Sequence, residues 1–497
     1  MIGPIQQSET KLFHYGVNLE KRIRTNHPLR AVKRAVNFGF VRPKVSGFYG
    51  KEGHQSEDPI VLMKMMLLLF FDNVSSEREL MRIIPERLDY LWFLDFDLDD
   101  EIPHHSVLSK ARKLWGGAIF EELFVETVRQ CVEAGLVEGS KLHMDGSLVE
   151  ANASKKSVTH GPAGLVEQLR GVYRREAGKL DLPPEGELPD GGGKSVKRCS
   201  VSKTDVDAAM ARKSATDPAR PRYKNHRGID DYCGVITAVE TTPGSQMEPQ
   251  KLMALVEQHE RNTGCPVKTV IADAQYGTNE NFAACQERKI RSHMKDYRAT
   301  QTNDSAKRGI FQQTDFHYDA ETETYLCPAG ERLKPTGRID RGFQVFVSDR
   351  KVCQQCSLRT KCTKSKRQIR TLKRHVAHDA IERARLESHS GFARQDRKRR
   401  HHLMERSFAD AANRHGFKRA RWRRLHNQRI QDLLIAACQN IRILIGSSRS
   451  PVAAAMGAAP KPLSADSRAP LGHWQHWQAR RADLGKPSWL PCWLEVF

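Results

Sequence analysis

The chain has 497 residues, too many for one simple core, so two or three domains are expected. Its formal net charge of +22 at pH 7 indicates a polyanionic partner, most simply nucleic acid, because each neutralised phosphate releases counterions. An acidic membrane surface is the alternative, but no apolar run reaches the roughly 18–20 residues that span a bilayer. No secretion signal is evident at the start, so we expect a cytoplasmic protein with no membrane association.

The first part of the chain is expected to be helical. Residues 1–57 form an N-terminal extension, and residues 58–135 have the pattern of several short helices. Asp58 and Pro59 are a typical helix start ahead of a strongly apolar run that reads as a buried helix, and Ser106 is the expected N-cap of a later helix. This helical domain has either a purely structural packing role or a binding role, in which it contacts DNA ends or a second copy of the chain. We favour contact with DNA.

Strands mixed with helices follow, which predicts an α/β core over residues 140–446. The expected strands cover residues 142–145, 147–151, 232–239, 267–271 and 290–294. Helices are expected near residues 256–261 and over residues 430–445; the second is strongly apolar and should pack the preceding basic block against the sheet.

Two polar segments stand apart from this core. The segment from about 178 to 221 is rich in Gly, Pro, Lys and Asp and is predicted to be a mobile insertion. Its run Gly-Gly-Gly-Lys-Ser at 191–195 is not a phosphate-binding loop, because Leu188 stands where that motif needs its first glycine and no strand precedes it. The tail, residues 447–497, is expected to be partly disordered, and its four tryptophans are candidates for docking on the body or a partner: Trp474, Trp477, Trp489 and Trp493.

Three acidic residues stand in conspicuous contexts. Asp145 follows a strand-like run, Asp273 follows a β-branched run, and Glu405 lies in a helix-like run rich in Arg and Lys. Carboxylate oxygens suit Mg²⁺ or Mn²⁺, and two ions roughly 3.5–4 Å apart stabilise both the attacking and the leaving oxygen of a phosphodiester. The three acids therefore predict a metal site for phosphodiester chemistry.

The surroundings of Glu405 are strongly basic: residues 394–424 hold twelve Lys or Arg against three acids. A lone Glu in such a block is usually a surface ion-pair partner. Phe408, however, shares the helical face of Glu405, which indicates a face anchored on a core. The predicted DNA-binding residues are Arg399, Arg400, Arg406, Lys418, Arg419, Arg421, Arg423 and Arg424.

Eleven cysteines, mostly scattered, fit a reducing cytosol better than a disulfide framework. Four of them fall in one segment, an insertion at about 310–370: Cys327, Cys353, Cys356 and Cys362. The Cys-x₂-Cys pair is able to grip one tetrahedral ion, and the other two thiolates would complete a structural Zn²⁺ site. A second Cys-x₂-Cys pair is missing, so the alternative is a set of reduced thiols. Soft sulfur ligands do not serve phosphoryl chemistry with Mg²⁺.

In this order the motifs resemble DDE transposases of bacterial insertion sequences, in the branch whose ribonuclease H-like core is interrupted before the glutamate. Asp145 in Asp-Gly-Ser, Asp273 in Ala-Asp-Ala-Gln-Tyr-Gly and Glu405 in Glu-Arg-Ser-Phe-Ala-Asp-Ala match the three catalytic acids of the family. The Cys-bearing insertion is similar to one in this branch, and the resemblance covers residues 45–446. The segments that resemble the helical domain of the family are residues 49–53, 75–80, 88–94 and 98–106.

The resemblance implies an α/β fold, a ribonuclease H-like mixed sheet with flanking helices, preceded by a small helical domain and interrupted by insertions. It implies cleavage of DNA at transposon ends and transfer of the freed 3′-hydroxyl into target DNA, with two Mg²⁺ or Mn²⁺ ions on the three acids. The implied partners are double-stranded DNA, as terminal inverted repeats and as target, and a second copy of the chain, at the bacterial nucleoid.

The sequence departs from the family at two positions. Ala412 stands where related transposases often carry a Lys, and His401 where many carry an Arg, so DNA contacts there must pass to Arg406, Lys418 or their neighbours. Two alternatives stay open: an inactive transposase that only binds DNA, and a metal-dependent nuclease without strand transfer.

Overall fold

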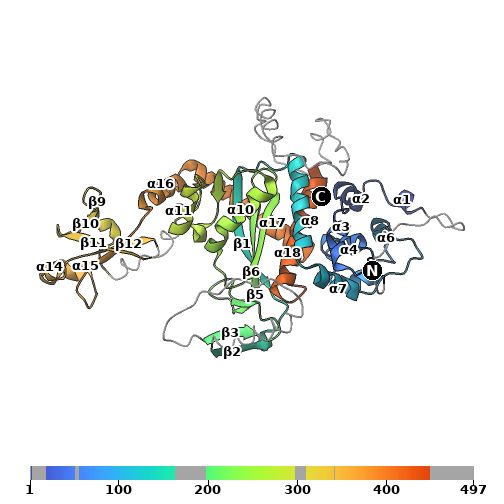
Figure 1. Cartoon of the computed structure of the whole chain (residues 1–497), viewed down its shortest axis with the longest axis horizontal. Coiled ribbons are helices and arrows are strands. Elements are labelled where there is room, and N and C mark those ends of the chain that lie inside the picture. The colour runs from blue at the N-terminus through green and yellow to red at the C-terminus, as the bar shows by residue number, and fades with distance from the viewer. Residues whose placement is uncertain are drawn as a thin grey trace, which may run out of the picture.

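The computed structural model describes Ile2 and residues 18–50, 55–162, 198–296, 309–340 and 342–447. Helices of the N-terminal part lie at one end, a central sheet with its helices lies in the middle, and a small module with its own sheet lies at the other end (Figure 1). The run at 191–195 and the tail beyond residue 447 fall outside the described residues. Within the described part of the chain, no helix is long and apolar enough to cross a membrane.

The N-terminal part is helical, as predicted, and its helices begin inside the predicted extension. They are α1 (Leu19–Arg22), α2 (Pro28–Ala35), α3 (Val41–Val45), η1 (Ser46–Phe48), α4 (Pro59–Phe71), α5 (Glu77–Ile83), α6 (Leu88–Leu94), α7 (Ser106–Trp115) and α8 (Ala118–Glu133). Asp58 caps α4 as predicted, because its side chain accepts a hydrogen bond from the amide of Ile60. The expected cap at Ser106 is wrong by one residue: Ser106 is the first residue of α7, and His105 precedes it.

The central sheet is mixed. Its strands are β1 (Lys141–Glu150), β4 (Ala209–Ala211), β5 (Arg220–Asp230), β6 (Ile236–Pro243), β7 (Thr269–Ile271) and β8 (Arg291–Ser292). The order is β4-β5-β1-β7-β8, and β6 pairs with β5 as well. Strand β5 pairs antiparallel with β4, β6 and β1, whereas β7 is parallel to β1 and β8 is parallel to β7.

Helices flank this sheet, and two further strands pair antiparallel in a small sheet of their own (Figure 1). The remaining elements of the central part are η2 (Lys155–Ser157), β2 (Val158–Pro162), β3 (Arg198–Ser202), η3 (Glu248–Lys251), α10 (Leu252–Thr263), η4 (Ala274–Tyr276), α11 (Asn279–Glu287), α16 (His378–Ser388), α17 (Gly391–His415) and α18 (Leu425–Ser447). The helices expected near 256–261 and over 430–445 are confirmed in α10 and α18.

Three details of the predicted core are wrong. Residues 232–235 form a turn instead of the start of a strand, since Asp230 accepts a hydrogen bond from the amide of Tyr232 and Gly234 adopts a positive φ of 75°. The described part of the predicted polar insertion contains β3, β4 and the start of β5, because apolar side chains there, including Val201 and Val206, are buried. Asp145 lies in the middle of β1, not at a strand end.

The N-terminal helices and the sheet share one hydrophobic core, in which α18 is the central element. Helix α18 packs against α2, α4 and α8 on one side and against β6 on the other. Leu434 and Ile435 are fully buried, as expected for a helix that is enclosed all round. Asn440 fixes its register, because its amide exchanges hydrogen bonds with both backbone groups of Ile236 in β6.

A buried arginine joins α17 to the sheet. Arg227 stands opposite Asp145 in the β1–β5 register and is fully buried. Its guanidinium donates hydrogen bonds to Ser407 of α17 and Gln439 of α18, and it lies 4.7 Å over the ring of Phe408. Burial of Phe408 confirms the anchored helical face that the sequence predicts. These contacts join α17 to β5 and to α18.

We predict that Ile435→Ala destabilises the whole protein by about 2–5 kcal/mol, because it opens a cavity in the shared core. Urea unfolding followed by fluorescence and by circular dichroism measures the loss. Leu386→Ala on α16 is the control: that side chain is 72% exposed, so its replacement should change stability by no more than about 0.5 kcal/mol. Equal effects of the two substitutions would contradict the shared core.

Candidate metal centre

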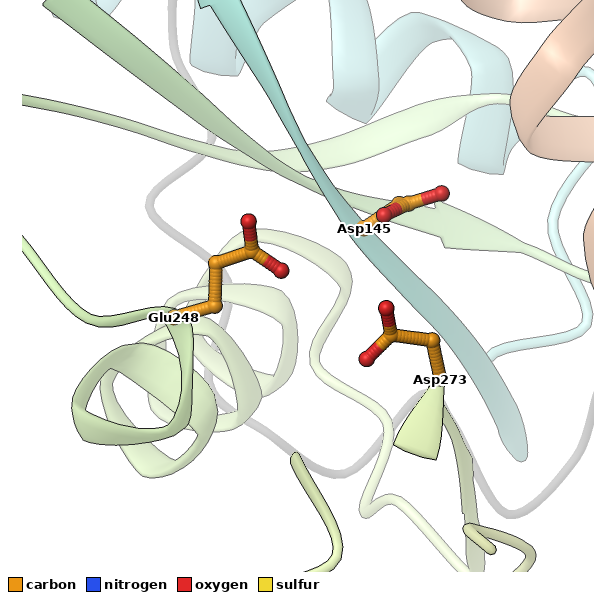
Figure 2. Close-up of side chains that lie close together, drawn as sticks. All are labelled: Asp145, Glu248 and Asp273. Carbon is orange, nitrogen blue, oxygen red and sulfur yellow. The ribbon is translucent and has the colours of Figure 1, made fainter. Parts of the chain in front are cut away.

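Three carboxylates from three separate segments converge beside β1 (Figure 2). They belong to Asp145, Glu248 and Asp273, and one oxygen of each lies within 4.8 Å of the others. Among the residues that the structure describes, these three form the one group of His, Cys, Asp or Glu side chains whose ligand atoms are this close. The structure thus brings Asp145 and Asp273 together, as predicted, and adds Glu248, which the sequence did not single out.

Asp145 is held by its own strand and by α17. One of its oxygens accepts a hydrogen bond from the amide of Gly146 at 2.8 Å. The other accepts a hydrogen bond from Arg400 of α17 at 2.9 Å, and Arg400 also donates to the carbonyl of Met144. The guanidinium therefore fixes the position of the carboxylate and supplies a positive charge to it.

Glu248 reaches the group because of a close approach to β1. It opens η3, directly before Pro249, after the turn that follows β6. A Cβ atom at Gly146 would lie only 3.0 Å from the carboxylate of Glu248, so a larger residue would push this side chain away. Lys224 of β5 is the cationic partner of Glu248, with 3.2 Å between the ammonium nitrogen and the carboxylate oxygen.

Asp273 caps the short helix η4, two residues beyond the end of β7. Its carboxylate accepts a hydrogen bond from the amide of Gln275 at 2.9 Å. Asn281 of α11 then joins the two loops of the site, since its amide donates to the carbonyls of Pro249 and Tyr276. The loop that carries Glu248 and the loop that carries Asp273 are therefore tied together.

Negative charge is unfavourable in this group. Burial raises the pKa of Asp145 above its usual value, Arg400 opposes this, and the charge of Asp273 adds to it. Burial also raises the pKa of Glu248, Lys224 opposes this, and the charges of Asp273 and Asp145 add to it. Arg400 and Lys224 thus offset the repulsion only in part, and a bound cation would relieve the rest.

A buried hydroxyl points to a missing partner at the same place. The side chain of Tyr276 is fully buried, and its hydroxyl has no hydrogen-bond partner among the residues that the structure describes. Burial raises the pKa of Tyr276 well above its usual value, as do the charges of Glu248, Asp145 and Asp273. A buried, unpaired donor within the field of three carboxylates needs a ligand or water to bond with. The donor set is all oxygen, which fits Mg²⁺ or Mn²⁺ and not a soft metal.

Glu405, the predicted third acid, is not a member of this group. It lies on α17 as predicted, with 69% of its side chain exposed and 3.4 Å from the imidazole of His401. At 100° per residue, Glu405 is about 140° around the helix from Arg400 and about 7.5 Å farther along its axis. This offset explains why Arg400 contacts Asp145 while Glu405 faces solvent.

Two family models match the chain, and both are transposase models. One is described as a transposase domain (DUF772) and matches residues 17–114; the other is described as a transposase DDE domain and matches residues 326–445. The chain is a DDE transposase of an insertion sequence. The second match includes Glu405, whereas Asp145, Glu248 and Asp273 lie between the two matches. A comparison with curated proteins gave no match.

A transposase of this kind binds DNA, and several of the predicted DNA-binding residues of this one are exposed. Arg406, Lys418, Arg419 and Arg423 present exposed side chains on α17 and on the loop that follows it. Arg399 is exposed as well but pairs with Asp231. Arg400 is half-buried against Asp145, and Arg424 is also half-buried.

Arg421 has a different environment from its basic neighbours. Its guanidinium donates hydrogen bonds to the carbonyls of Leu69 and Val74 and to the side chain of Asn73, all at the end of α4. Trp422 next to it packs edge-on against Phe70. Arg421 therefore holds the loop after α17 on the N-terminal helices, and its predicted role as a DNA contact is not supported by this position.

Sequence reasoning missed Glu248 because its local signal is ambiguous. An acid before a proline at the start of a helix is common, since it favours the positive end of the helix dipole. Only the pairing of β5 with both β1 and β6 shows that the turn after β6 returns to Asp145. Tyr276 lies in the same short motif as Asp273, but the motif alone does not predict that its hydroxyl is buried.

We predict that Glu248→Gln stabilises the metal-free transposase at neutral pH and reduces the stabilisation by Mn²⁺. Because the pKa of Glu248 is raised in the folded state, this carboxyl group lowers the stability of the folded protein as pH rises through that pKa. The stability gained by Glu248→Gln should therefore vanish in acid. Wild type should gain about 2.7 kcal/mol at a Mn²⁺ concentration 100 times the Kd. Thermal unfolding with chelator and with Mn²⁺, at about pH 4 and about pH 7.5, measures both effects.

The matched control is Glu240→Gln on β6, which removes an acid that pairs with Lys251 outside the group. This control should not stabilise the metal-free protein and should leave the Mn²⁺ effect intact. If Glu248→Gln and Glu240→Gln behaved alike, Glu248 would not belong to a cation site.

Proposed function

We propose that this transposase cleaves DNA strands at the ends of its insertion sequence and transfers them into target DNA, with a divalent cation held at Asp145, Asp273 and Glu248. The observation that carries the proposal is the convergence of three repelling carboxylates, whose charges also act on the buried, unpaired hydroxyl of Tyr276. An all-carboxylate site in a strongly basic DNA-binding protein fits phosphodiester chemistry better than any other reaction of this donor set.

The proposal includes a ribonuclease H-like catalytic domain over about residues 140–446. The mixed sheet supports it: the antiparallel strands β4, β6, β5 and β1 continue into the parallel strands β7 and β8, and helices flank the sheet (Figure 1). The Cys-bearing segment falls between β8 and α17, which fits the expected interruption of the core before the helix of Glu405.

Divalent cations, when bound, activate the attacking oxygen and stabilise charge on the phosphoryl group. The residues of the chain would prepare that site. Arg400 holds Asp145 in its position, and Lys224 does the same for Glu248. Tyr276 would donate its hydroxyl hydrogen to a ligand or water beside the carboxylates, which fixes its orientation. Exposed cations along α17 would bind the DNA backbone and set its register.

Glu405 remains the third catalytic acid in this proposal, on the strength of the family resemblance. It shares α17 with Arg400, and its carboxylate is exposed toward any ligand that approaches this helix. We propose that Glu405 engages the site when DNA is bound, while Glu248 belongs to the cation site of the free protein. Substitution of Glu405 therefore tests the DNA-bound site, and substitution of Glu248 tests the cation site of the free protein.

The proposal predicts that Asp145→Asn, Asp273→Asn and Glu405→Gln each abolish strand cleavage but leave DNA binding intact. The assay uses duplexes cloned from the flanks of the coding sequence and Mg²⁺ or Mn²⁺, with gel analysis of nicked and joined products. Matched controls are Glu257→Gln on α10 and Glu387→Gln on α16, two exposed helical glutamates outside the site.

Three outcomes separate the proposal from its alternatives. Cleavage followed by joining to target DNA supports strand transfer. Cleavage without joining indicates a nuclease, and binding without cleavage by the wild type indicates a protein that only binds DNA. Cleavage at the wild-type rate by Glu405→Gln would remove Glu405 from the site and leave Glu248 as the third acid.

The basic residues give a further prediction. Lys418→Gln and Arg419→Gln should each weaken binding to any duplex and lower the slope of log affinity against log salt by about 1. Arg421→Gln should leave that slope unchanged and lower thermal stability instead, because its guanidinium bonds to α4. Fluorescence anisotropy over a salt series measures the slope. A lower slope for Arg421→Gln than for the other two would contradict these assignments.

A further inference from the structure

The Cys-bearing module has a small core of its own. Its five strands are β9 (His317–Asp319), β10 (Thr324–Leu326), β11 (Arg332–Asp340), β12 (Phe343–Val347) and β13 (Thr371–His375), in the order β13-β12-β11-β10-β9. Around them lie η5 (Gln313–Asp315), α14 (Arg350–Gln355) and α15 (Arg359–Cys362). The module lies at the end of the molecule opposite the N-terminal helices (Figure 1).

This core is too small to explain a well-defined fold. Five apolar side chains are buried in it: Phe316, Tyr325, Leu333, Phe346 and Leu372. Many other residues of its strands are exposed, including most of β11. Folds of fewer than about 70–80 residues usually need a disulfide or a metal to supplement such a core. None of the module's four cysteines forms a disulfide.

The four cysteines of the module line one cavity. Cys327 follows β10, Cys353 lies in α14, Cys356 follows α14, and Cys362 ends α15. In the sequence, Cys327 precedes β11 and β12, and the other three cysteines follow these strands. A single ion in this cavity would therefore tie the two short helices to the turn after β10.

The local backbone is arranged to accept thiolates. The amide of Glu331 points at the sulfur of Cys327 at 3.4 Å, in a tight turn closed by the hydrogen bond from Gly330 to the carbonyl of Cys327. Cys353 and Cys356 flank a comparable turn, in which the amide of Cys356 bonds to the carbonyl of Cys353. Amide donors to sulfur stabilise the thiolate form that binds metal.

The cavity lining carries a small excess of positive charge, and a dication with four thiolates would carry a net charge of −2. Arg332, Arg359 and Arg370 line the cavity together with two acids, Glu331 and Asp349.

We propose that Cys327, Cys353, Cys356 and Cys362 bind one structural Zn²⁺ ion that holds the module together. The sulfurs are farther apart than the carboxylates of the metal centre, for no three of them lie within 4.8 Å of one another in the described structure. Metal binding would therefore draw the four side chains closer together and release the thiol protons. This site is independent of the proposed function.

The test measures metal in the purified full-length protein, in an Asp145→Asn background that removes the carboxylate site. Zinc content by mass spectrometry should be about one per chain. Cobalt replacement should give the absorption of a tetrahedral thiolate complex. Cys356→Ala should lose the metal, while Cys356→His should keep it because histidine is also a zinc ligand. Cys285→Ala, on α11 in the core of the central part, is the control and should keep the metal.

The outcomes distinguish loss of metal from loss of fold. Retention by Cys356→His and loss by Cys356→Ala support the site, and a chelator should then lower the thermal midpoint of the parent protein but not of Cys356→Ala. Equal zinc content in all variants would overturn the proposal. So would a parent protein without zinc whose intact mass has lost two hydrogens, which indicates a disulfide.

Discussion

The mutual repulsion of three carboxylates is the constraint around which the central part of this molecule is organised. Asp145, Glu248 and Asp273 are held within 4.8 Å of one another although burial makes their charges costly. The fold offsets that cost with the guanidinium of Arg400 and the ammonium of Lys224, and it makes room for Glu248 by the absence of a side chain at Gly146. A site that is unfavourable when empty of cations is typical of a functional site.

Helix α17 connects this site to the rest of the protein. Arg400 near its middle contacts Asp145, and Ser407 farther along accepts a hydrogen bond from the buried Arg227. Beyond its end, the backbone around Lys418 and Ala420 extends the edge of β1 at Glu150, and Arg421 then bonds to the N-terminal helices. The residues proposed to bind DNA therefore lie on a segment that contacts both the central sheet and the N-terminal helices.

The sequence predicts much of this arrangement because the relevant signals are local. The β-branched run before Asp273, the apolar repeat of α18 and the anchored face at Phe408 each predict an element that the structure contains. Glu248, which joins Asp145 and Asp273 in the free protein, is brought there by a long-range pairing, that of β5 with both β1 and β6. Nothing in the residues around Glu248 carries that information. The same holds for Arg421, whose basic surroundings resemble a DNA contact although its guanidinium bonds to α4.

Anomalous diffraction from crystals of the free transposase soaked in Mn²⁺ tests the central claim most directly. The account predicts an anomalous peak bounded by the carboxylates of Asp145, Glu248 and Asp273, with the hydroxyl of Tyr276 hydrogen-bonded to a ligand or water beside the ion. A saturated crystal with no peak at these carboxylates, or with its peak elsewhere on the chain, would contradict it.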